Sequence, residues 1–349
     1  MAFSALRRSQ RDGRGKGKNT TRSENTDIDP NEEIRMVLIG KTGNGKSESG
    51  NNILNRKAFA SVLSPQSVTS ECEKAKGMVD GRRVAVIDTP GIYDTKYKEA
   101  EVLGKLKECI SFSAPGPHVF LIVVKLSRFT EEEQKTVELL QQVFGDKAAD
   151  YSMVLFTHGD RLGQTKIEDF FRKSHQLSHL IRKCNGRYHV LNNTLSDNSQ
   201  GPQLLAKIVK MIGENGGTFY TNEMFQEAEK AIQEQQLKIL KASAEQKLRE
   251  EEKLRAMFEG EHLQKELNNL NNEYKRKSRE KAERKNKFIH TGLVITTAEV
   301  GMAIGAGAAA VGGPICIAVG AAVGGAVGAV VGVLAPAAVI ALKNKCSVQ

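Results

Sequence analysis

The chain has 349 residues, of which 40% are hydrophobic, and its formal net charge is +10. This length and hydrophobic content exclude a wholly disordered chain and predict about two domains. The five cysteines lack CxxC pairing or metal-ligand spacing, and the N-terminus lacks the apolar core of a signal peptide. We therefore expect a cytosol-facing protein with neither structural disulfides nor structural zinc.

Composition changes sharply along the chain. Residues 1–30 are polar and rich in Arg, Gly and Ser, which predicts a disordered basic arm. Residues 31–217 alternate apolar and amphipathic blocks, as a globular domain does. Residues 218–287 are dominated by Glu, Lys, Gln and Arg, residues 288–342 by Gly, Ala, Val and Ile, and residues 343–349 form a short tail. Because the arm interleaves almost no aromatic residue with its charges, we expect no specific nucleic-acid partner.

Residues 40–47, GKTGNGKS, match the phosphate-loop pattern G-x-x-x-x-G-K-[ST] and lie between an apolar run and a helix-like run. Such a loop surrounds nucleotide phosphates with backbone N–H groups and directs a helix N-terminus at them. Lys46 is expected to reach the β- and γ-phosphates, and the Ser47 hydroxyl to bind the Mg²⁺ that bridges them. The other nucleotide contacts predicted in and beside this loop are Gly40, Lys41, Thr42, Gly43, Asn44, Gly45 and Glu48. The alternative is a plain glycine-rich turn after a strand.

Two further segments are typical of a GTPase. The loop at 61–72 is rich in hydroxyl residues, and Thr69 is the candidate whose hydroxyl and carbonyl respond to Mg²⁺ and the γ-phosphate. The alternative is an ordinary loop threonine. A strand-like run ends in D-T-P-G, where Asp88 is expected to hold Mg²⁺ and Gly91 to offer its N–H to the γ-phosphate. Ile92 stands where many GTPases carry a water-orienting Gln, which predicts slow intrinsic hydrolysis.

Residues 118–145 read as a buried strand, a short loop and an amphipathic helix. Thr130 and Glu133 have the spacing of a capping box, so we assign the acidic residues at this helix start to capping rather than to catalysis. Arg128 lies just before the cap, at the carboxyl edge of the sheet, where the nucleotide sits in open α/β folds. It is our catalytic candidate, an arginine that stabilises the transition state across a dimer. The alternative is an ordinary surface arginine.

The apolar run YSMVLF is followed by T-H-G-D. Asp160 is expected to accept hydrogen bonds from both guanine donors, as the Asp of N-K-x-D does in GTPases. The match is partial because Thr157 and His158 replace Asn and Lys, and His158 either packs against the base or is an ordinary loop histidine. The next strand, RYHVLNN, ends in Asn192 and Asn193, which are placed for a second contact to the purine.

Taken in this order, GKTGNGKS, DTPGIYD, the box GPHVFLIVVKLSRFTEEEQKTVELLQQVFG, FTHGDRL and RYHVLNN closely resemble the GIMAP family of immunity-associated GTPases, which are related to septins and to chloroplast import-receptor GTPases. The resemblance covers about residues 31–215. It implies an α/β fold, a P-loop NTPase G domain with a mostly parallel central sheet, which binds GDP and GTP and dimerises through its nucleotide face. It also implies association with intracellular membranes and related GTPases, and it strengthens the assignment of Arg128 as a residue acting in trans.

Residues 222–287 contain no Pro and a single Gly, and their Glu, Lys, Gln, Leu and Ala content predicts a long helix. The apolar residues in it are too sparse for a continuous heptad seam. We therefore expect a charged helix that folds partly back on the globular domain or extends as a stalk. A two-stranded coiled coil is the alternative.

The end of this helix, YKRKSREKAERKNK, is polybasic and directly precedes the apolar stretch 288–342, in which Glu299 is the one charged residue. Residues 312–314, Gly-Gly-Pro, split the stretch into two runs long enough to span or nearly span a bilayer, and the basic flanks favour a hairpin with both ends in the cytosol. We therefore expect attachment to the cytosolic face of an intracellular membrane through an anionic lipid surface. A single span, a hairpin docked on protein, and lipidation of Cys346 are alternatives.

The sequence thus predicts a membrane-attached, dimerising GTP-binding protein that uses Mg²⁺. In the first hypothesis it is a slow GTPase, and Arg128 favours this. In the second it is a non-catalytic scaffold whose nucleotide controls assembly, and Ile92 favours this. Asp160 argues against a third class, an ATPase.

Overall fold

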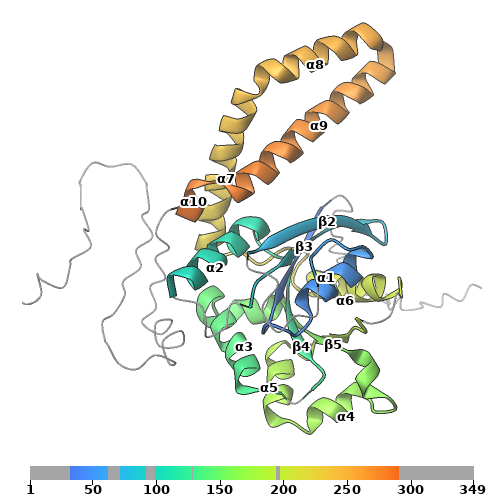
Figure 1. Ribbon diagram of the computed structural model, residues 1–349, viewed down its shortest axis with the longest axis vertical. Coiled ribbons are helices and arrows are strands. Elements are labelled where there is room, and N and C mark those ends of the chain that lie inside the picture. The colour runs from blue at the N-terminus through green and yellow to red at the C-terminus, as the bar shows by residue number, and fades with distance from the viewer. Residues whose placement is uncertain (1–31, 62–70, 92–98, 128, 194–196, 291–349) are drawn as a thin grey trace, which may run out of the picture.

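A computed structural model describes residues 32–61, 71–91, 99–127, 129–193 and 197–290. It consists of a globular α/β body from which a long helical hairpin projects (Figure 1). The predicted basic arm, the tail at 343–349 and most of the predicted membrane segment lie outside the described residues, as do three single positions discussed above: Thr69, Ile92 and Arg128.

The body is built on a six-stranded sheet. In spatial order its strands are β2 (Glu73–Val79), β3 (Arg82–Asp88), β1 (Ile34–Ile39), β4 (Val119–Lys125), β5 (Ser152–Thr157) and β6 (Tyr188–Val190). Every neighbouring pair is parallel except β2 and β3, which are antiparallel. β1 and β5 are buried along their whole length, as expected for parallel strands covered on both faces. The predicted α/β fold with a mostly parallel sheet is confirmed.

Helices cover both faces of this sheet. They are α1 (Lys46–Leu54), α2 (Glu99–Ser113), α3 (Glu131–Phe144), α4 (Ile167–Arg172), α5 (His175–Lys183) and α6 (Gln200–Glu214), with two 3-10 turns, η1 (Asp146–Tyr151) and η2 (Gly159–Leu162). Side chains alternate along each strand, so Met36 and Leu38 pack in one cluster with α1 and α6, while Val37 and Ile39 pack in the other with α2 and α3. The loops at the carboxyl ends of the parallel strands are thereby left at one edge.

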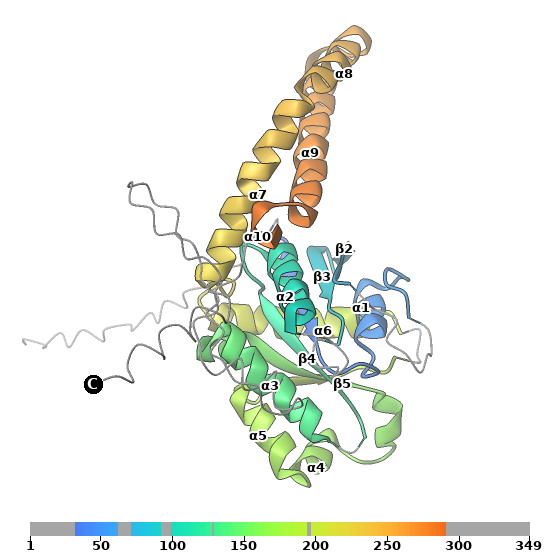
Figure 2. The ribbon, with the colours of Figure 1, turned by 60° about the vertical axis from the view of Figure 1, so that its left-hand side comes forward.

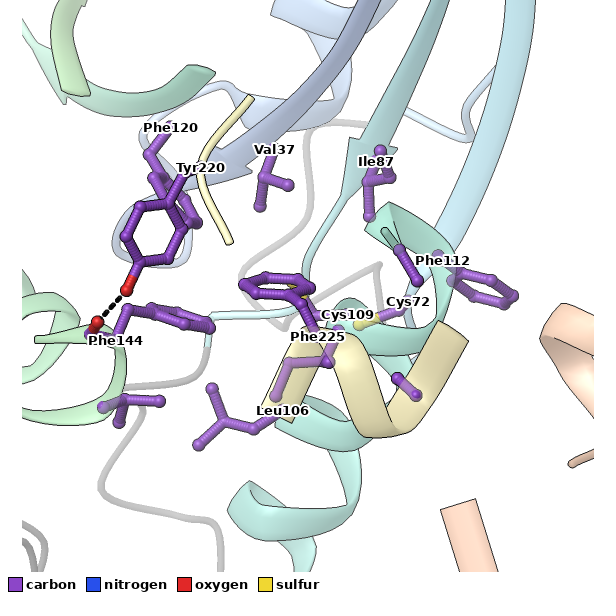
Figure 3. Close-up of a cluster of buried hydrophobic side chains, with 14 of the residues drawn as sticks. Val37, Cys72, Ile87, Leu106, Cys109, Phe112, Phe120, Phe144, Tyr220 and Phe225 are labelled. Atoms are coloured by element: carbon purple, nitrogen blue, oxygen red, sulfur yellow. Dashed lines mark hydrogen bonds between the residues drawn. The ribbon is translucent and has the colours of Figure 1, made fainter. Parts of the chain in front are cut away.

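The extension starts inside the core of the body. Phe225, from α7 (Glu223–Ala242), stacks on Phe144 of α3 at 5.8 Å between ring centroids and meets Tyr220 edge-on at 6.0 Å. The hydroxyl of Tyr220 donates a hydrogen bond to the carbonyl oxygen of Phe144, and Phe120 of the sheet packs against both rings (Figure 3). The predicted boundary at residue 217 therefore falls within one continuous packed unit.

The extension is a hairpin rather than one long helix. α7 and α8 (Ala244–Met257) lead outward, and α9 (Gly260–Arg284) returns beside α7 before α10 (Lys287–His290) (Figures 1 and 2). The turn at the tip contains Gly260, whose φ of 59° lies in the left-handed region that glycine adopts at low cost. The expected single long helix is thus divided into several, and the hairpin they form projects from the body while the base of α9 packs against α2. The alternative of a two-stranded coiled coil stays a prediction.

Polar contacts fasten the base of the hairpin to the body. Glu283 of α9 forms an ion pair with Lys74 of β2 at 2.9 Å, and its carbonyl oxygen accepts a hydrogen bond from Ser111 of α2 at 2.6 Å. Arg279 donates a hydrogen bond to the carbonyl oxygen of Ala114, just after α2, at 3.1 Å, and its ion pair with Glu229 of α7 at 2.6 Å joins the two arms of the hairpin. Phe288 of α10 is buried in the cluster that contains α2 and α7, so the first residues of the predicted membrane segment belong to the body.

Among the residues placed in this structure, no helix combines the length and the apolar character needed to cross a membrane. The apolar stretch from residue 291 to 342 lies outside those residues. The membrane hairpin therefore stays a prediction.

Candidate nucleotide-binding site

The loop at 40–45 connects the end of β1 to the start of α1, at the edge where the parallel strands end (Figure 1). Gly45 has a φ of 86°, a conformation that other residues rarely adopt. A Cβ at Gly45 would lie 2.8 Å from the amide nitrogen of Asn193, and one at Gly40 would lie 2.6 Å from the carbonyl oxygen of Val123. The close approach of the Val123 backbone therefore requires glycine at position 40, and the positive φ favours glycine at position 45.

Lys46 is the first residue of α1, and its side chain turns back over the loop. Its ammonium donates hydrogen bonds to the carbonyl oxygens of Gly40 at 2.9 Å and Lys41 at 3.1 Å. Burial lowers the pKa of Lys46 to about 8, an effect that the negative charge of Asp88 partly offsets. A desolvated cation held by two carbonyl groups at a helix N-terminus is suited to binding phosphate.

Ser47 and Asp88 are the predicted Mg²⁺ ligands, and the fold brings them together. The Ser47 hydroxyl donates a hydrogen bond to a carboxylate oxygen of Asp88 at 2.6 Å, although the two residues are 41 positions apart. Mg²⁺ prefers oxygen ligands of this kind, so the donor set fits the ion. Thr69, the third predicted ligand, lies outside the described residues.

Gly91 follows β3 and reaches the phosphate loop. A Cβ at Gly91 would lie 2.1 Å from the hydroxyl oxygen of Thr42 and 2.9 Å from its backbone nitrogen. The two predicted phosphate-contacting segments thus touch, and only a residue without a side chain permits it. Glu48 lies in the first turn of α1.

The predicted base-recognition turn follows β5 and is tied to the phosphate loop. The Thr157 hydroxyl donates a hydrogen bond to the carbonyl oxygen of Asn44 at 2.8 Å. His158 precedes η2 and has a φ of 61°. Its pKa is lowered mainly by partial burial and, to a smaller extent, by the positive charges of Lys125 and Arg161. The side chain of Asp160 is exposed in this turn. Thr157, which replaces the expected Asn, therefore anchors the turn.

Asn192 and Asn193, after β6, meet the loop from the other side. The side-chain amide of Asn193 donates to the carbonyl oxygen of Gly45 at 3.4 Å and accepts from Asn52 of α1 at 3.3 Å. The Gln200 side chain holds the backbone of Asn192, accepting from its N–H at 2.6 Å and donating to its carbonyl oxygen at 3.1 Å. All described members of the predicted site thus gather at one edge.

Glu133 contacts the phosphate loop, and reasoning from the sequence did not predict this contact. The predicted capping box at the start of α3 is present. One carboxylate oxygen of Glu133 accepts from the backbone N–H of Thr130 at 2.9 Å, and the other accepts from the side-chain amide of Asn44 at 3.0 Å. The capping-box spacing accounts for the first bond. No local pattern signals the second, because it joins residues 89 positions apart.

The amino-acid sequence is similar to a family model and to several known proteins. The model of the AIG1 family matches residues 34–239. GTPase IMAP family member 8 of Homo sapiens is 34% identical over 194 residues, which are 54% of this chain and 29% of that protein. Immune-associated nucleotide-binding protein 9 of Arabidopsis thaliana is 36% identical over 219 residues, 60% of this chain and 63% of that protein. The chain thus spans less than two thirds of the length of these two relatives.

A third relative is covered more fully. Immune-associated nucleotide-binding protein 4 of Arabidopsis thaliana is 30% identical over 267 residues, 73% of this chain and 81% of that protein. Among solved structures, Toc33 from Arabidopsis thaliana in complex with GDP and Mg²⁺ aligns at 18% identity with a TM-score of 0.43, over 54% of this chain and 88% of that one. On the extent of the family match, the chain belongs to the AIG1 family, together with the immunity-associated GTPases that its motifs resemble.

Proposed function

We propose that this protein binds GTP and GDP with Mg²⁺, dimerises through its nucleotide face and hydrolyses GTP slowly at the cytosolic face of an intracellular membrane. The observation that carries the proposal is the buried ammonium of Lys46, folded over a glycine loop beside the Ser47–Asp88 pair. Fixed cations and backbone donors of this kind stabilise the negative charge that phosphoryl transfer spreads over the phosphate oxygens.

Each part of the site has a role in this proposal. Lys46 holds the β- and γ-phosphates as a point charge, while Ser47 and Asp88, with Thr69, hold Mg²⁺, which supplies further charge neutralisation when bound. Asp160 accepts from the guanine donors, and its exposed position leaves it accessible to a base. The names of two relatives contain the words GTPase and nucleotide-binding, which agrees with this assignment.

Hydrolysis is proposed to require a second copy of the chain. Ile92 cannot orient water, so a group from outside the site has to complete it, and Arg128 precedes the capped start of α3 in the sequence. Related GTPases are proposed as alternative partners in the dimer. If no such group acts, the alternative function is a non-catalytic scaffold whose nucleotide controls assembly, and Ile92 favours that reading.

The proposal of membrane attachment rests on the basic residues near the end of the described chain. Lys281, Arg284, Lys285 and Lys287 are all exposed beside α10, and the apolar stretch follows directly. A cluster of this kind is attracted to anionic lipid by roughly 1 kcal/mol for each basic residue.

The test is GTP turnover per molecule of the full-length chain over a wide range of protein concentration. A steep rise that Arg128→Ala abolishes, with GTP preferred to ATP in binding, supports the enzyme. Negligible turnover with tight GTP binding leaves the scaffold, and a preference for ATP refutes both. Asp160→Ala should weaken GTP binding by about 100-fold, because two hydrogen bonds to a charged acceptor are lost, and should leave ATP binding unchanged.

The affinity for GTP is expected to fall as the pH rises above about 8. Phosphate binding needs the ammonium form of Lys46, and burial lowers its pKa to about 8, so in the free protein the proton is lost through this pH while bound phosphates retain it. Uptake of at most one proton limits the slope to about tenfold per pH unit. Titration of a fluorescent GTP analogue between pH 7 and 9.5 measures it. Asp160→Ala is the matched control, with weaker binding but the same slope, and a flat profile in the wild type contradicts the expectation.

A further inference from the structure

The side chain of Asn44 links the phosphate loop to the start of α3. Both Asn44 and Glu133 are 5% exposed. The Asn44 amide nitrogen uses both of its hydrogens, donating one bond to the carbonyl oxygen of Val123 at 2.9 Å and one to Glu133 at 3.0 Å. The backbone carbonyl oxygen of Asn44 accepts a hydrogen bond from the Thr157 hydroxyl at 2.8 Å. The residue directly before Gly45 and Lys46 is therefore held by β4, α3 and the end of β5.

Glu133 divides its two carboxylate oxygens between two tasks. One accepts from Asn44, and the other accepts from the backbone N–H of Thr130 at 2.9 Å and from the Thr130 hydroxyl at 3.3 Å. Capping of α3 requires only the second set of bonds. The buried bond to Asn44 is unexplained by capping.

We propose that Glu133 is a positioning residue for phosphate binding, which acts through Asn44 to hold the phosphate loop in its binding conformation. Because the same carboxylate holds Thr130, a displacement of the loop is transmitted to the start of α3, and a displacement of α3 to the loop. This inference rests on the proposed function, since phosphate is the ligand that the loop is held to bind. Glu133 touches no phosphate itself.

The chemistry requires a carboxylate rather than an amide at position 133. Both of its oxygens face N–H donors, so a Gln side chain would turn its own NH₂ group toward either Asn44 or Thr130. Rotation of the Asn44 amide does not repair this, because its oxygen would then face the carbonyl oxygen of Val123. Glu133→Gln therefore preserves volume but cannot make both bonds: with its NH₂ toward Asn44 the buried bond is lost, and with its NH₂ toward Thr130 the backbone N–H of Thr130 loses its acceptor.

The experiment compares Glu133→Gln with Thr130→Val in the full-length chain. Thr130→Val removes the exposed hydroxyl from the cap and leaves the bond between Glu133 and Asn44 in place. We expect Glu133→Gln to weaken binding of a fluorescent GTP analogue about tenfold, and Thr130→Val to change it less than twofold, at matched thermal stability. In an Asn44→Ala background the effect of Glu133→Gln should disappear, as a double-mutant cycle detects. Equal losses in the two variants, or effects that add in the double variant, overturn the proposal.

A second measurement needs no nucleotide. Backbone hydrogen exchange over residues 40–47 of the nucleotide-free chain should be faster in Glu133→Gln than in the wild type and unchanged in Thr130→Val. If the wild type binds no GTP, the proposed function fails, while the exchange comparison still tests whether Glu133 holds the loop. Unchanged exchange in Glu133→Gln overturns the positioning role.

Discussion

Lys46→Met is expected to weaken GTP binding by about 10²- to 10³-fold and at the same time to stabilise the nucleotide-free protein. The ammonium is the charged donor that faces the phosphates, and hydrogen bonds to charged groups contribute about 1.5–3 kcal/mol each. The pKa of Lys46, lowered from 10.5 to about 8 by burial, means that the empty folded state disfavours the charge it carries. An apolar side chain of similar length removes that cost, so we expect a gain of about 1–3 kcal/mol in the free energy of unfolding at pH 7.

Two measurements separate these effects: titration of a fluorescent GTP analogue and urea unfolding of the nucleotide-free chain. Between the folded-state pKa of about 8 and the unfolded-state value of 10.5, the unfolded chain binds more protons at Lys46, so wild-type stability rises with pH and the advantage of the variant shrinks. Lys57→Met, at an exposed lysine just after α1, is the control and should change neither quantity appreciably. A destabilised Lys46→Met variant would mean that the ammonium supports the loop rather than straining it.

Glu283→Gln is expected to cost about 3–5 kcal/mol of the free energy of unfolding, because it leaves a buried lysine without its charged partner. The ammonium of Lys74 contacts both carboxylate oxygens of Glu283, at 3.0 and 2.9 Å, and the two side chains are only 6% and 4% exposed. The carboxylate of Glu33 is 4.0 Å from the ammonium of Lys74, so it would offset the lost charge of Glu283 only in part. This pair connects the edge strand of the sheet to the base of α9, so its loss should also loosen the hairpin.

Urea unfolding of the full-length chain measures this cost. Burial lowers the pKa of Lys74, so the deficit of the variant should shrink as the pH rises above neutrality and Lys74 becomes neutral. The matched control is Glu234→Gln. Glu234 forms an ion pair with Lys287, and the side chains are 43% and 58% exposed, respectively, so this pair is expected to contribute less than about 1 kcal/mol to the free energy of unfolding. A double variant, Lys74→Met with Glu283→Leu, should recover most of the loss. An equal, small effect of Glu283→Gln and Glu234→Gln contradicts the expectation.

Local sequence patterns were sufficient to predict the phosphate loop and the parallel sheet. The loop is contiguous, and its glycine positions follow from backbone conformation and close approach, so GKTGNGKS predicts its own structure. The buried strands are uninterrupted apolar runs, which predict a parallel sheet without knowledge of their order. Predicting Asp88 beside Ser47 was also within reach, because the carboxyl ends of parallel strands meet at one edge of the sheet.

The helical extension marks the limit of such patterns. Helix propensity and charge content predict helix from residue 222 to 287, yet they do not say where a helix reverses or what it packs on. Gly260 was the visible signal for the reversal, and its left-handed conformation is now apparent at the tip. Phe225 gave no sign that it would stack on Phe144 in the core of the body.

The sequence by itself determined the family, the α/β fold and the residues of the phosphate loop, because these depend on side chains that are near one another in the chain. Only the tertiary structure decided which distant groups share a bond: Glu133 with Asn44, 89 positions apart, Thr157 with Asn44, 113 apart, and Lys74 with Glu283, 209 apart. The physical reason is that a buried hydrogen bond or ion pair requires a partner at about 3 Å in a site without water. The packing of helices on the sheet supplies that partner, and no local periodicity encodes it.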